Sequence, residues 1–527
     1  MRLPNRSALA AVALVSSLAF TPFPSPAQQS AAPPSDLDAW VARVMKEFEV
    51  PGLSVAIVKD GKVVAAKGYG VRELGKPGKV DANTRFGIAS NTKIFTATAL
   101  ALLVEEGKLE WDAPVIRYLP SFAMYDPFVT REITVRDLLV HRSGLGLGAG
   151  DLMWWPSSDY SRQEIVQHLR YIKPATSFRS AYAYDNVLYS VAGEVIKAVS
   201  GQSWEDFVSS RILAKIGMTG SNARASLATK GDNEAITHAE VEGTVRPITP
   251  FANDNVDPAG GINSSANDMA KWLIVQLDSG RVADGSRLFS PRSTRQLWGM
   301  VTPIPIGDPA PELAALRPQF NGYALGLGVR DYRGRKILTH TGGLPGYVSQ
   351  VTMVPSLRLG VVVLTNQESG SAFQSITFHV LDHYLGAPPT DYVSIYSKLD
   401  ARQAARYDSV TAAASTTRDS TAGPSLPLDR YVGKYTDPWY GEIDITRSAD
   451  GLAIRFTHTP SLSGELIHWQ YDTFVARWHD RELRADAYLT FSLNPDGSIS
   501  HAKMQAVSPA TDFSYDFQDL LLTPKDR

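Results

Sequence analysis

The sequence contains no cysteine among its 527 residues. This absence excludes disulfide bonds, thiolate metal ligands, a cysteine nucleophile and a lipid anchor attached through cysteine. An excess of charge of one sign is also absent, because 52 Lys and Arg residues stand against 54 Asp and Glu residues. A nearly neutral chain without long single-sign runs does not fit nucleic acid or an anionic membrane surface as a partner.

A hydrophobic run long enough to span a membrane is missing as well. The apolar stretch from Ala8 to about Phe20 is too short and is followed by small residues and prolines, with "SPA" ending at Ala27. A basic start, an apolar stretch and a small-residue site are typical of a secretory signal peptide. We therefore predict that residues 1–27 are a signal peptide and that the protein is exported, to the periplasm or the medium, without a membrane span.

Strand patterns occur near both ends of a first domain, predicted over 36–388. The segment "LSVAIVKDGKVVAAKGYGV" predicts a hairpin around Asp60 and Gly61, and further strands are predicted from about 321 to 365. The chain between about 109 and 277 is mostly helical in pattern, and a helix is predicted at about 372–385. These elements predict an α+β fold, in which one antiparallel sheet is flanked by helices and accompanied by an all-helical subdomain.

The composition changes after this domain. Small, polar and proline residues, as in "TAAASTTRDSTAGPSLP", predict a linker over 389–427. From 428 to 527 several short strand patterns separated by turns predict a small antiparallel barrel or sandwich. The chain should therefore fold as two domains.

One pair of residues in "IASNTKIFTA" suggests nucleophilic catalysis. Ser90 and Lys93 are three apart, so on a helix they share a face and the amine can reach the hydroxyl. Burial of Lys93 with the apolar helix that follows would favour its neutral form, which can accept the serine proton. Chance is the alternative, since Ser500 and Lys503 repeat the spacing in a strand pattern, where they point to opposite faces.

Two further motifs supply possible partners. In "AYAYDNV", Tyr184 and Asn186 precede a predicted helix, from which a phenol and an amide can reach a cleft. In "ILTHTGG", His340, Thr341 and Gly342 end a strand pattern, where paired glycines permit close approach of a substrate. Taken singly, each motif is more often packing or a turn, but their joint occurrence in this order favours a catalytic site.

With these motifs the chain resembles the penicillin-recognising serine hydrolase superfamily, in the branch similar to class C beta-lactamases. The resemblance covers about 36–385 and extends to "ITVRDLLVHRSGL", "DPAGGINSSANDMAKWL" and "GYALGLGV". It implies a beta-lactamase/transpeptidase-like fold and a hydrolase that acts through an acyl-enzyme without a cofactor or metal.

The resemblance also implies a role for each motif residue. Ser90 is expected to be acylated, and Lys93 and Tyr184 to share the base and acid duties. Asn186 is expected to bind the substrate amide, and the residues of the third motif to form a wall of the cleft. An oxyanion hole is expected from the backbone N–H groups of Ser90 and Gly343.

One residue departs from the beta-lactamase pattern. His340 stands where those enzymes carry lysine, and histidine is only partly charged near neutral pH. Efficient beta-lactam hydrolysis is therefore less expected than hydrolysis of a small peptide or ester. We predict a peptidase for unusual peptides, for example with D-residues or derived from linearised cyclic peptides. Esterase or beta-lactamase activity, and a penicillin-binding sensor or scaffold without turnover, are the alternatives.

The C-terminal domain, with "LDRYVGKYTDPWYGEIDI", resembles the lipocalin-like barrels appended to some of these hydrolases. In such relatives the barrel covers the cleft or joins subunits, so a homo-oligomer is possible; a passive stabilising role is the alternative. For Trp154 and Trp155, packing within a loop is favoured over contact with substrate.

Three further histidines lie outside the three catalytic motifs. His379 and His383 are four apart on a predicted helix, but no third ligand accompanies them, so we predict a capping or solvated role and no metal. His141 is predicted to fix a loop by hydrogen bonds.

Overall fold

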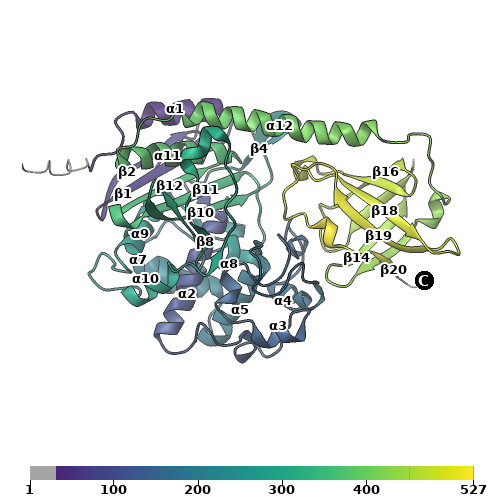
Figure 1. The fold of residues 1–527 in the computed structure, drawn as a ribbon, viewed down its shortest axis with the longest axis horizontal. Coiled ribbons are helices and arrows are strands. Elements are labelled where there is room, and N and C mark those ends of the chain that lie inside the picture. The colour runs from purple at the N-terminus through teal and green to yellow at the C-terminus, as the bar shows by residue number, and fades with distance from the viewer. Residues whose placement is uncertain (1–30, 450, 526–527) are drawn as a thin grey trace, which may run out of the picture.

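The structure is a computed structural model that describes residues 31–449 and 451–525. It shows two domains joined by a long helix, with the C-terminal domain lying beside the helical part of the first (Figure 1). The predicted signal peptide, 1–27, lies outside the described residues.

One antiparallel sheet of eight strands forms the centre of the first domain, in the order β2-β1-β12-β11-β10-β9-β8-β7. Its strands are β1 (Gly52–Lys59), β2 (Lys62–Gly70), β7 (Thr302–Pro303), β8 (Asn321–Tyr323), β9 (Gly328–Tyr332), β10 (Arg335–Leu344), β11 (Tyr347–Val354) and β12 (Leu359–Thr365). The N-terminal hairpin pairs through β1 with β12, so strands from both ends of the domain meet, as the sequence predicts.

Helices cover both faces of this sheet, with α1 (Leu37–Glu47) and α11 (Gly370–Leu385) on one face and α9 (Ala266–Leu277) on the other (Figure 1). Successive side chains of a strand point to opposite faces. Accordingly Val55 and Ile57 of β1 pack with α1 and α11, whereas Ala56 and Val58 belong to the core on the α9 side. Burial on both faces explains why β1 and β12 are apolar almost throughout.

The helical part of the domain lies on the α9 side of the sheet. It contains α2 (Lys93–Glu105), α3 (Pro127–Glu132), α4 (Arg162–His168), α5 (Val187–Ser200), α6 (Trp204–Val208), α7 (Ala214–Ile216), α8 (Asp257–Gly260), α10 (Pro291–Leu297) and the short strands β3 (Phe86–Gly87), β4 (His238–Val241), β5 (Thr244–Pro247) and β6 (Asn263–Ser264). Helix α2 is buried from Lys93 to Leu103, in agreement with its apolar residues on every side.

The segment predicted as a linker contains helix α12 (Tyr392–Thr416), which is 25 residues long. Only its first turns are anchored, through the buried side chains of Tyr392, Val393 and Tyr396, and most of its remaining length is exposed. Its many Ala, Ser and Thr residues form no regular apolar stripe, so its sequence resembles that of a linker. No helix in the described ranges has the length and apolar character needed to cross a membrane.

The C-terminal domain is a nearly closed antiparallel barrel, as expected. Its sheet has the order β19-β18-β17-β16-β15-β14-β13-β20, and an additional bridge between Ala502 and Leu522 brings its two ends together. Its strands are β13 (Gly433–Asp437), β14 (Gly441–Arg447), β15 (Leu452–Phe456), β16 (Ser463–Gln470), β17 (Thr473–Trp478), β18 (Ala487–Leu493), β19 (Ile499–Ala506) and β20 (Thr523–Pro524).

Polar contacts fix the barrel against the first domain. The buried carboxylate of Asp516 accepts hydrogen bonds from the backbone N–H groups of Gly150, at 2.6 Å, and Leu152, at 3.0 Å. Elsewhere in the interface Arg484 forms a bidentate pair with Glu368, at 2.6 and 2.8 Å. The barrel is therefore docked on the loop around 148–154, which also contributes to the candidate site.

Candidate active site

Ser90 lies in the short helix η1 (Ala89–Thr92), which leads directly into α2. The residue before it, Ala89, has a φ of +49°, a conformation that costs a residue with a side chain about 1 kcal/mol or more. Strain of this kind is common where a turn presents a reactive side chain. It is maintained here by the fully buried packing of Ala89 and of the first turns of α2.

Lys93 follows one turn later and has no exposed surface. Its Nζ donates hydrogen bonds to Ser90 Oγ at 3.0 Å, Asn186 Oδ1 at 2.8 Å and the carbonyl of Ala259 at 3.1 Å. Burial lowers the pKa of Lys93 to about 7, against the opposing effect of nearby carboxylates. The amine is thus held against the serine hydroxyl and can lose its proton near neutral pH.

A buried carboxylate lies behind this amine. Asn186 donates from Nδ2 to Asp151 Oδ2 at 2.8 Å, and the hydroxyl of Ser514, in the barrel domain, donates to the same oxygen at 2.8 Å. The other oxygen of Asp151 accepts from the indole of Trp154 at 2.8 Å. Burial raises the pKa of Asp151 to about 7. The carboxamide of Asn186 is therefore held in one orientation between Lys93 and Asp151.

Tyr184 is placed beside the nucleophile by the loop before α5. Burial raises the pKa of Tyr184 well above 10, and a hydrogen bond with the Ser90 side chain offsets part of that shift. Its ring lies against that of His141, with centroids 4.2 Å apart. His141 Nδ1 accepts a hydrogen bond from the backbone N–H of Asp185 at 3.1 Å, so this histidine fixes the loop, as predicted. At neutral pH the Tyr184 phenol is a proton donor.

Strand β10 passes very close to η1 at the third motif. A Cβ on Gly342 would lie 2.3 Å from the carbonyl oxygen of Ile88 and 2.5 Å from Ser349 Oγ, so glycine is required there. Ser349 itself donates to Ile88 at 2.7 Å and fixes this contact. In contrast, a Cβ on Gly343 would meet no atom within 4 Å. The two glycines thus have different roles: one permits close packing and the other leaves the cavity open.

His340 is neutral in this environment. Its Nδ1–H donates to the carbonyl of Thr341 at 2.5 Å, which leaves Nε2 to accept from the hydroxyl of Tyr323 at 2.6 Å. Burial lowers the pKa of His340 to about 3, and the charge of Lys93 contributes to this shift. The position of the beta-lactamase lysine therefore carries no positive charge at neutral pH.

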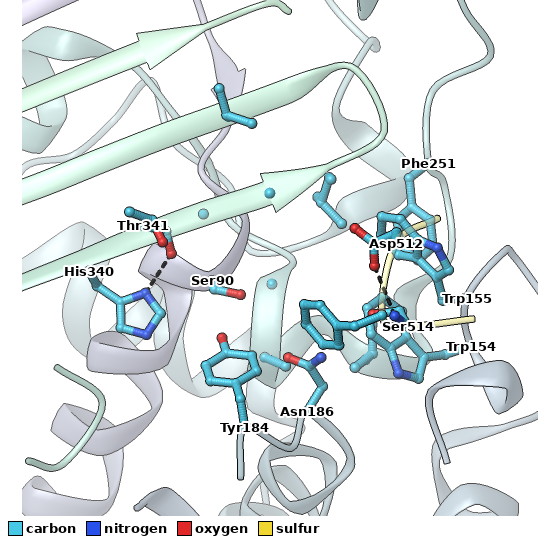
Figure 2. Close-up of a pocket in the computed structure, with 18 of the residues that line it drawn as sticks. Ser90, Trp154, Trp155, Tyr184, Asn186, Phe251, His340, Thr341, Asp512 and Ser514 are labelled. Atoms are coloured by element: carbon cyan, nitrogen blue, oxygen red, sulfur yellow. Dashed lines mark hydrogen bonds between the residues drawn. The ribbon is translucent and has the colours of Figure 1, made fainter. Parts of the chain in front are cut away.

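These groups border one cavity of about 480 Å³ (Figure 2). Seven of the predicted site residues line this cavity: Ser90, Tyr184, Asn186, His340, Thr341, Gly342 and Gly343. The eighth, Lys93, lies beneath them. Trp154 and Trp155 also line the cavity, although both are mostly buried in their loop, so they pack and border the site at once. A second cavity, of about 360 Å³, shares Tyr182, Tyr184, His340 and Thr341 with the first.

Several residues of this site were not predicted from the sequence. Asp151 lies in a glycine-rich loop that gives no periodic signal, and Tyr182 could have been found from its alternation with Tyr184 in an extended segment. Asp512, Phe513 and Ser514 line the cavity from the barrel domain. Their contribution depends on how the domains dock, which no local pattern encodes.

The histidine pair of α11 lies away from this cavity. His379 contacts Asp36, with Nε2 3.0 Å from Oδ1, and His383 contacts the carbonyl of Ala32 at 3.1 Å. Within the described ranges, no group of three or more possible metal-binding side chains was found. The pair ties α11 to the segment before α1.

Both domains match known sequence profiles. The sequence profile described as Beta-lactamase matches residues 37–385, the domain that carries Ser90, Lys93 and Tyr184. The chain belongs to the beta-lactamase family. This match confirms the resemblance inferred from the motifs. A second profile, described as Domain of unknown function (DUF3471), matches residues 417–524, which include the barrel.

The chain is similar in sequence to curated proteins and in fold to solved structures. It is 28% identical over 462 residues to "Unguisins hydrolase ungD" of Aspergillus violaceofuscus, a match covering 80% of this chain and 78% of that protein. The octameric penicillin-binding protein homologue from Pyrococcus abyssi has a TM-score of 0.58 at 23% identity, covering 89% and 97% of the two chains. A D-stereospecific amidohydrolase from Streptomyces sp. has a TM-score of 0.52 at 21% identity, covering 66% and 98%.

Proposed function

We propose that this member of the beta-lactamase family is a serine peptidase that acts through an acyl-enzyme. The observation that carries the proposal is the contact between the buried amine of Lys93 and Ser90 Oγ, at 3.0 Å, at the floor of an open cavity. An amine with a pKa of about 7 is a suitable general base at neutral pH. The proposal does not involve a metal or an organic cofactor.

The reaction divides into acylation and hydrolysis. Neutral Lys93 takes the proton of Ser90 as its oxygen attacks the substrate carbonyl, and the backbone N–H groups of Ser90 and Gly343 stabilise the oxyanion. The protonated phenol of Tyr184 gives its proton to the leaving amine and recovers one through Lys93. Water then attacks the acyl group with the same residues in reversed roles, which releases the acid and restores Ser90.

Two adjoining cavities beside Ser90 support a peptide substrate. The cavity above Ser90 and the adjoining cavity meet at His340, Thr341 and Tyr184, so groups can be held on two sides of the nucleophile. The first is bordered by aromatic side chains. The second is bordered by polar groups such as Gln350 and Thr352 and by Arg330, whose guanidinium donates to backbone carbonyls. Neutral hydrogen-bonding groups match the amides of a peptide chain. We propose small or unusual peptides, including those with D-residues or from linearised cyclic peptides.

A library of peptides in L and D configuration, analysed by mass spectrometry, tests this function. We expect wild-type protein to cleave a subset, and the Ser90→Ala variant to cleave none while retaining its thermal stability. A covalent adduct on Ser90, seen by intact mass during turnover, would identify the acyl-enzyme. Peptide cleavage that survives the Ser90→Ala change would refute the proposal.

Esters and beta-lactams are the alternative substrates, and one observation bears on the second. The neutral His340 offers no fixed cation to a substrate carboxylate, so efficient beta-lactam hydrolysis is not expected. A p-nitrophenyl ester compared with a matched peptide amide separates esterase from peptidase, because only the amide requires protonation of its leaving group. Permanent labelling by a fluorescent penicillin, without turnover of any substrate, would instead indicate a sensor or scaffold.

Export is also proposed, from the signal-peptide pattern of residues 1–27. Expression of the full chain in a Gram-negative bacterium, followed by fractionation, should place the mature protein in the periplasm or medium. Its N-terminal sequence is expected to begin after Ala27. An uncleaved protein retained in the cytoplasm would be evidence against this proposal.

A further inference from the structure

The loop 511–514 of the barrel domain forms part of the wall of the catalytic cavity. Asp512, Phe513 and Ser514 all line the cavity that holds Ser90. Asp512 and Phe513 are exposed residues, and both also border a neighbouring hollow. The Phe513 ring lies edge-to-face on Tyr184, with centroids 6.1 Å apart. In Figure 2, Asp512 lies on the side of the cavity opposite to His340, with Ser90 between them.

The charge of this cavity is unbalanced. Of the lining residues in the described part of the chain, Asp512 is the only Asp, Glu, Lys or Arg, and His340 is neutral. The Asp512 carboxylate accepts a hydrogen bond from the backbone N–H of Ser514 at 2.9 Å. Burial raises the pKa of Asp512, and the charge of Arg484, which is paired with Glu368 at 2.6 Å, acts in the opposite direction. The cavity therefore offers a carboxylate that lacks an ion-pair partner among the described residues.

Aromatic side chains lie next to this carboxylate. Trp155 and Phe251 line the same side of the cavity (Figure 2). Both are mostly buried, and their rings stack with centroids 5.9 Å apart and an angle of 26° between the planes. Ammonium groups are attracted to aromatic faces and to carboxylates, and most strongly where bulk water is excluded. A substrate carboxylate placed here would instead be repelled by Asp512.

We propose that Asp512, with Trp155 and Phe251, binds a positively charged amine of the substrate. The barrel domain thereby selects substrates for the catalytic domain. The inference rests on the proposed function for the nature of the ligand, since a peptide carries such an amine at its free N-terminus or on a lysine side chain. Amine recognition by this loop explains why the cavity lacks both the lysine of the beta-lactamases and any other positive charge on its surface.

Binding to the full-length Ser90→Ala protein tests the proposal without requiring turnover. The probes are Phe-Ala-Ala amides of both configurations, each with a free or an acetylated N-terminus, measured by isothermal titration calorimetry. For at least one configuration, we expect the peptide with a free amine to bind at least about tenfold more tightly than its acetylated form. A gain of this size is typical of a hydrogen-bonded charge pair. A second pair of peptides has an acetylated N-terminus and either Lys or norleucine as its first residue. This pair shows whether the site binds a side-chain amine in place of the N-terminal amine.

The double variant Ser90→Ala, Asp512→Asn should bind the free and acetylated peptides equally, with the acetylated affinity changed by less than about twofold. The matched control, Asp496→Asn with Ser90→Ala, alters an exposed acid in the β18–β19 turn of the same domain and should retain the preference. If Asp512→Asn does not fold, by circular dichroism, Asp512→Ser takes its place.

Three results would overturn the proposal. They are equal binding of charged and uncharged members of both probe pairs, a preference that persists after replacement of Asp512, and an equal loss of affinity for all peptides, which would assign Asp512 a structural role only. These outcomes are separate from the proposed function, which fails if peptide turnover survives Ser90→Ala whatever the binding preference.

Discussion

Asn186 joins Lys93 to Asp151: its Oδ1 accepts from the lysine amine at 2.8 Å, and its Nδ2 donates to the carboxylate at 2.8 Å. The orientation of the carboxamide is thereby fixed, because reversal would place two donors against each other. Ser514, in the barrel domain, adds a further hydrogen bond by donating from its hydroxyl to Asp151. The amine that faces Ser90 is thus positioned by both domains.

The first prediction concerns the pH profile. Below its pKa of about 7 Lys93 is charged and cannot accept the serine proton, and above it the amine is free to do so. We therefore expect kcat/KM for an N-acetylated peptide amide, which has no titrating amine of its own, to rise with pH through about 7 and then level off. Lys93→Ala should lower kcat/KM by about 10² to 10⁴-fold and remove this limb. A flat profile between pH 5.5 and 8.5 would contradict the assignment.

The second prediction concerns Asp151, a positioning residue. Its negative charge raises the pKa of Lys93, so removal of the charge should lower that pKa further. The Asp151→Asn variant is expected to shift the acid limb of kcat/KM to lower pH. A purely structural role would reduce the rate without moving the limb, so the complete pH profile distinguishes the two. The exposed acid Asp408, on α12, provides an Asp→Asn control that should leave the profile unchanged.

The third prediction concerns His340. Replacement by lysine would supply a cation where the neutral imidazole now lies, and a charge-assisted hydrogen bond to a substrate carboxylate becomes possible. We expect His340→Lys to increase the rate of acylation by a fluorescent penicillin by about tenfold. His340→Gln is the matched neutral control and should give no such gain. Equal rates for the two variants would show that charge at this position does not govern beta-lactam recognition.

The fourth prediction uses the two adjacent glycines. Gly342→Ala should force β10 away from η1, because its Cβ would lie 2.3 Å from the carbonyl of Ile88. A loss of about 1–3 kcal/mol in the free energy of unfolding is expected, together with lower turnover. Gly343→Ala, whose Cβ meets no neighbour, should leave the thermal midpoint nearly unchanged. Similar losses of stability in both variants would argue against close packing as the reason for Gly342.

The elements that the sequence predicts well are those specified by local pattern. The Ser90 and Lys93 pair, the loop with Tyr184 and the strand end at His340 each have a distinct motif, and one cavity brings them together. A sheet built from both ends of the domain is predicted by the apolar runs of β1 and β12, which are buried on both faces. In these places local pattern and tertiary environment agree.

What the sequence could not predict depends on long-range packing. Helix α12 lacks an apolar stripe because only Tyr392, Val393 and Tyr396 are buried, so its composition indicates a linker. Asp512 and Ser514 become site residues only when the barrel docks against the first domain. No spacing rule relates residues that are 363 positions apart, as Asp151 and Ser514 are.

This separation has a consequence for biosynthesis. The ribosome synthesises Ser90 and Lys93 long before the loop 511–514, which lines the same cavity from the barrel domain. Until that loop has been made and the barrel has docked, the wall of the cavity is incomplete. Assembly of the cavity therefore depends on the folding of both domains.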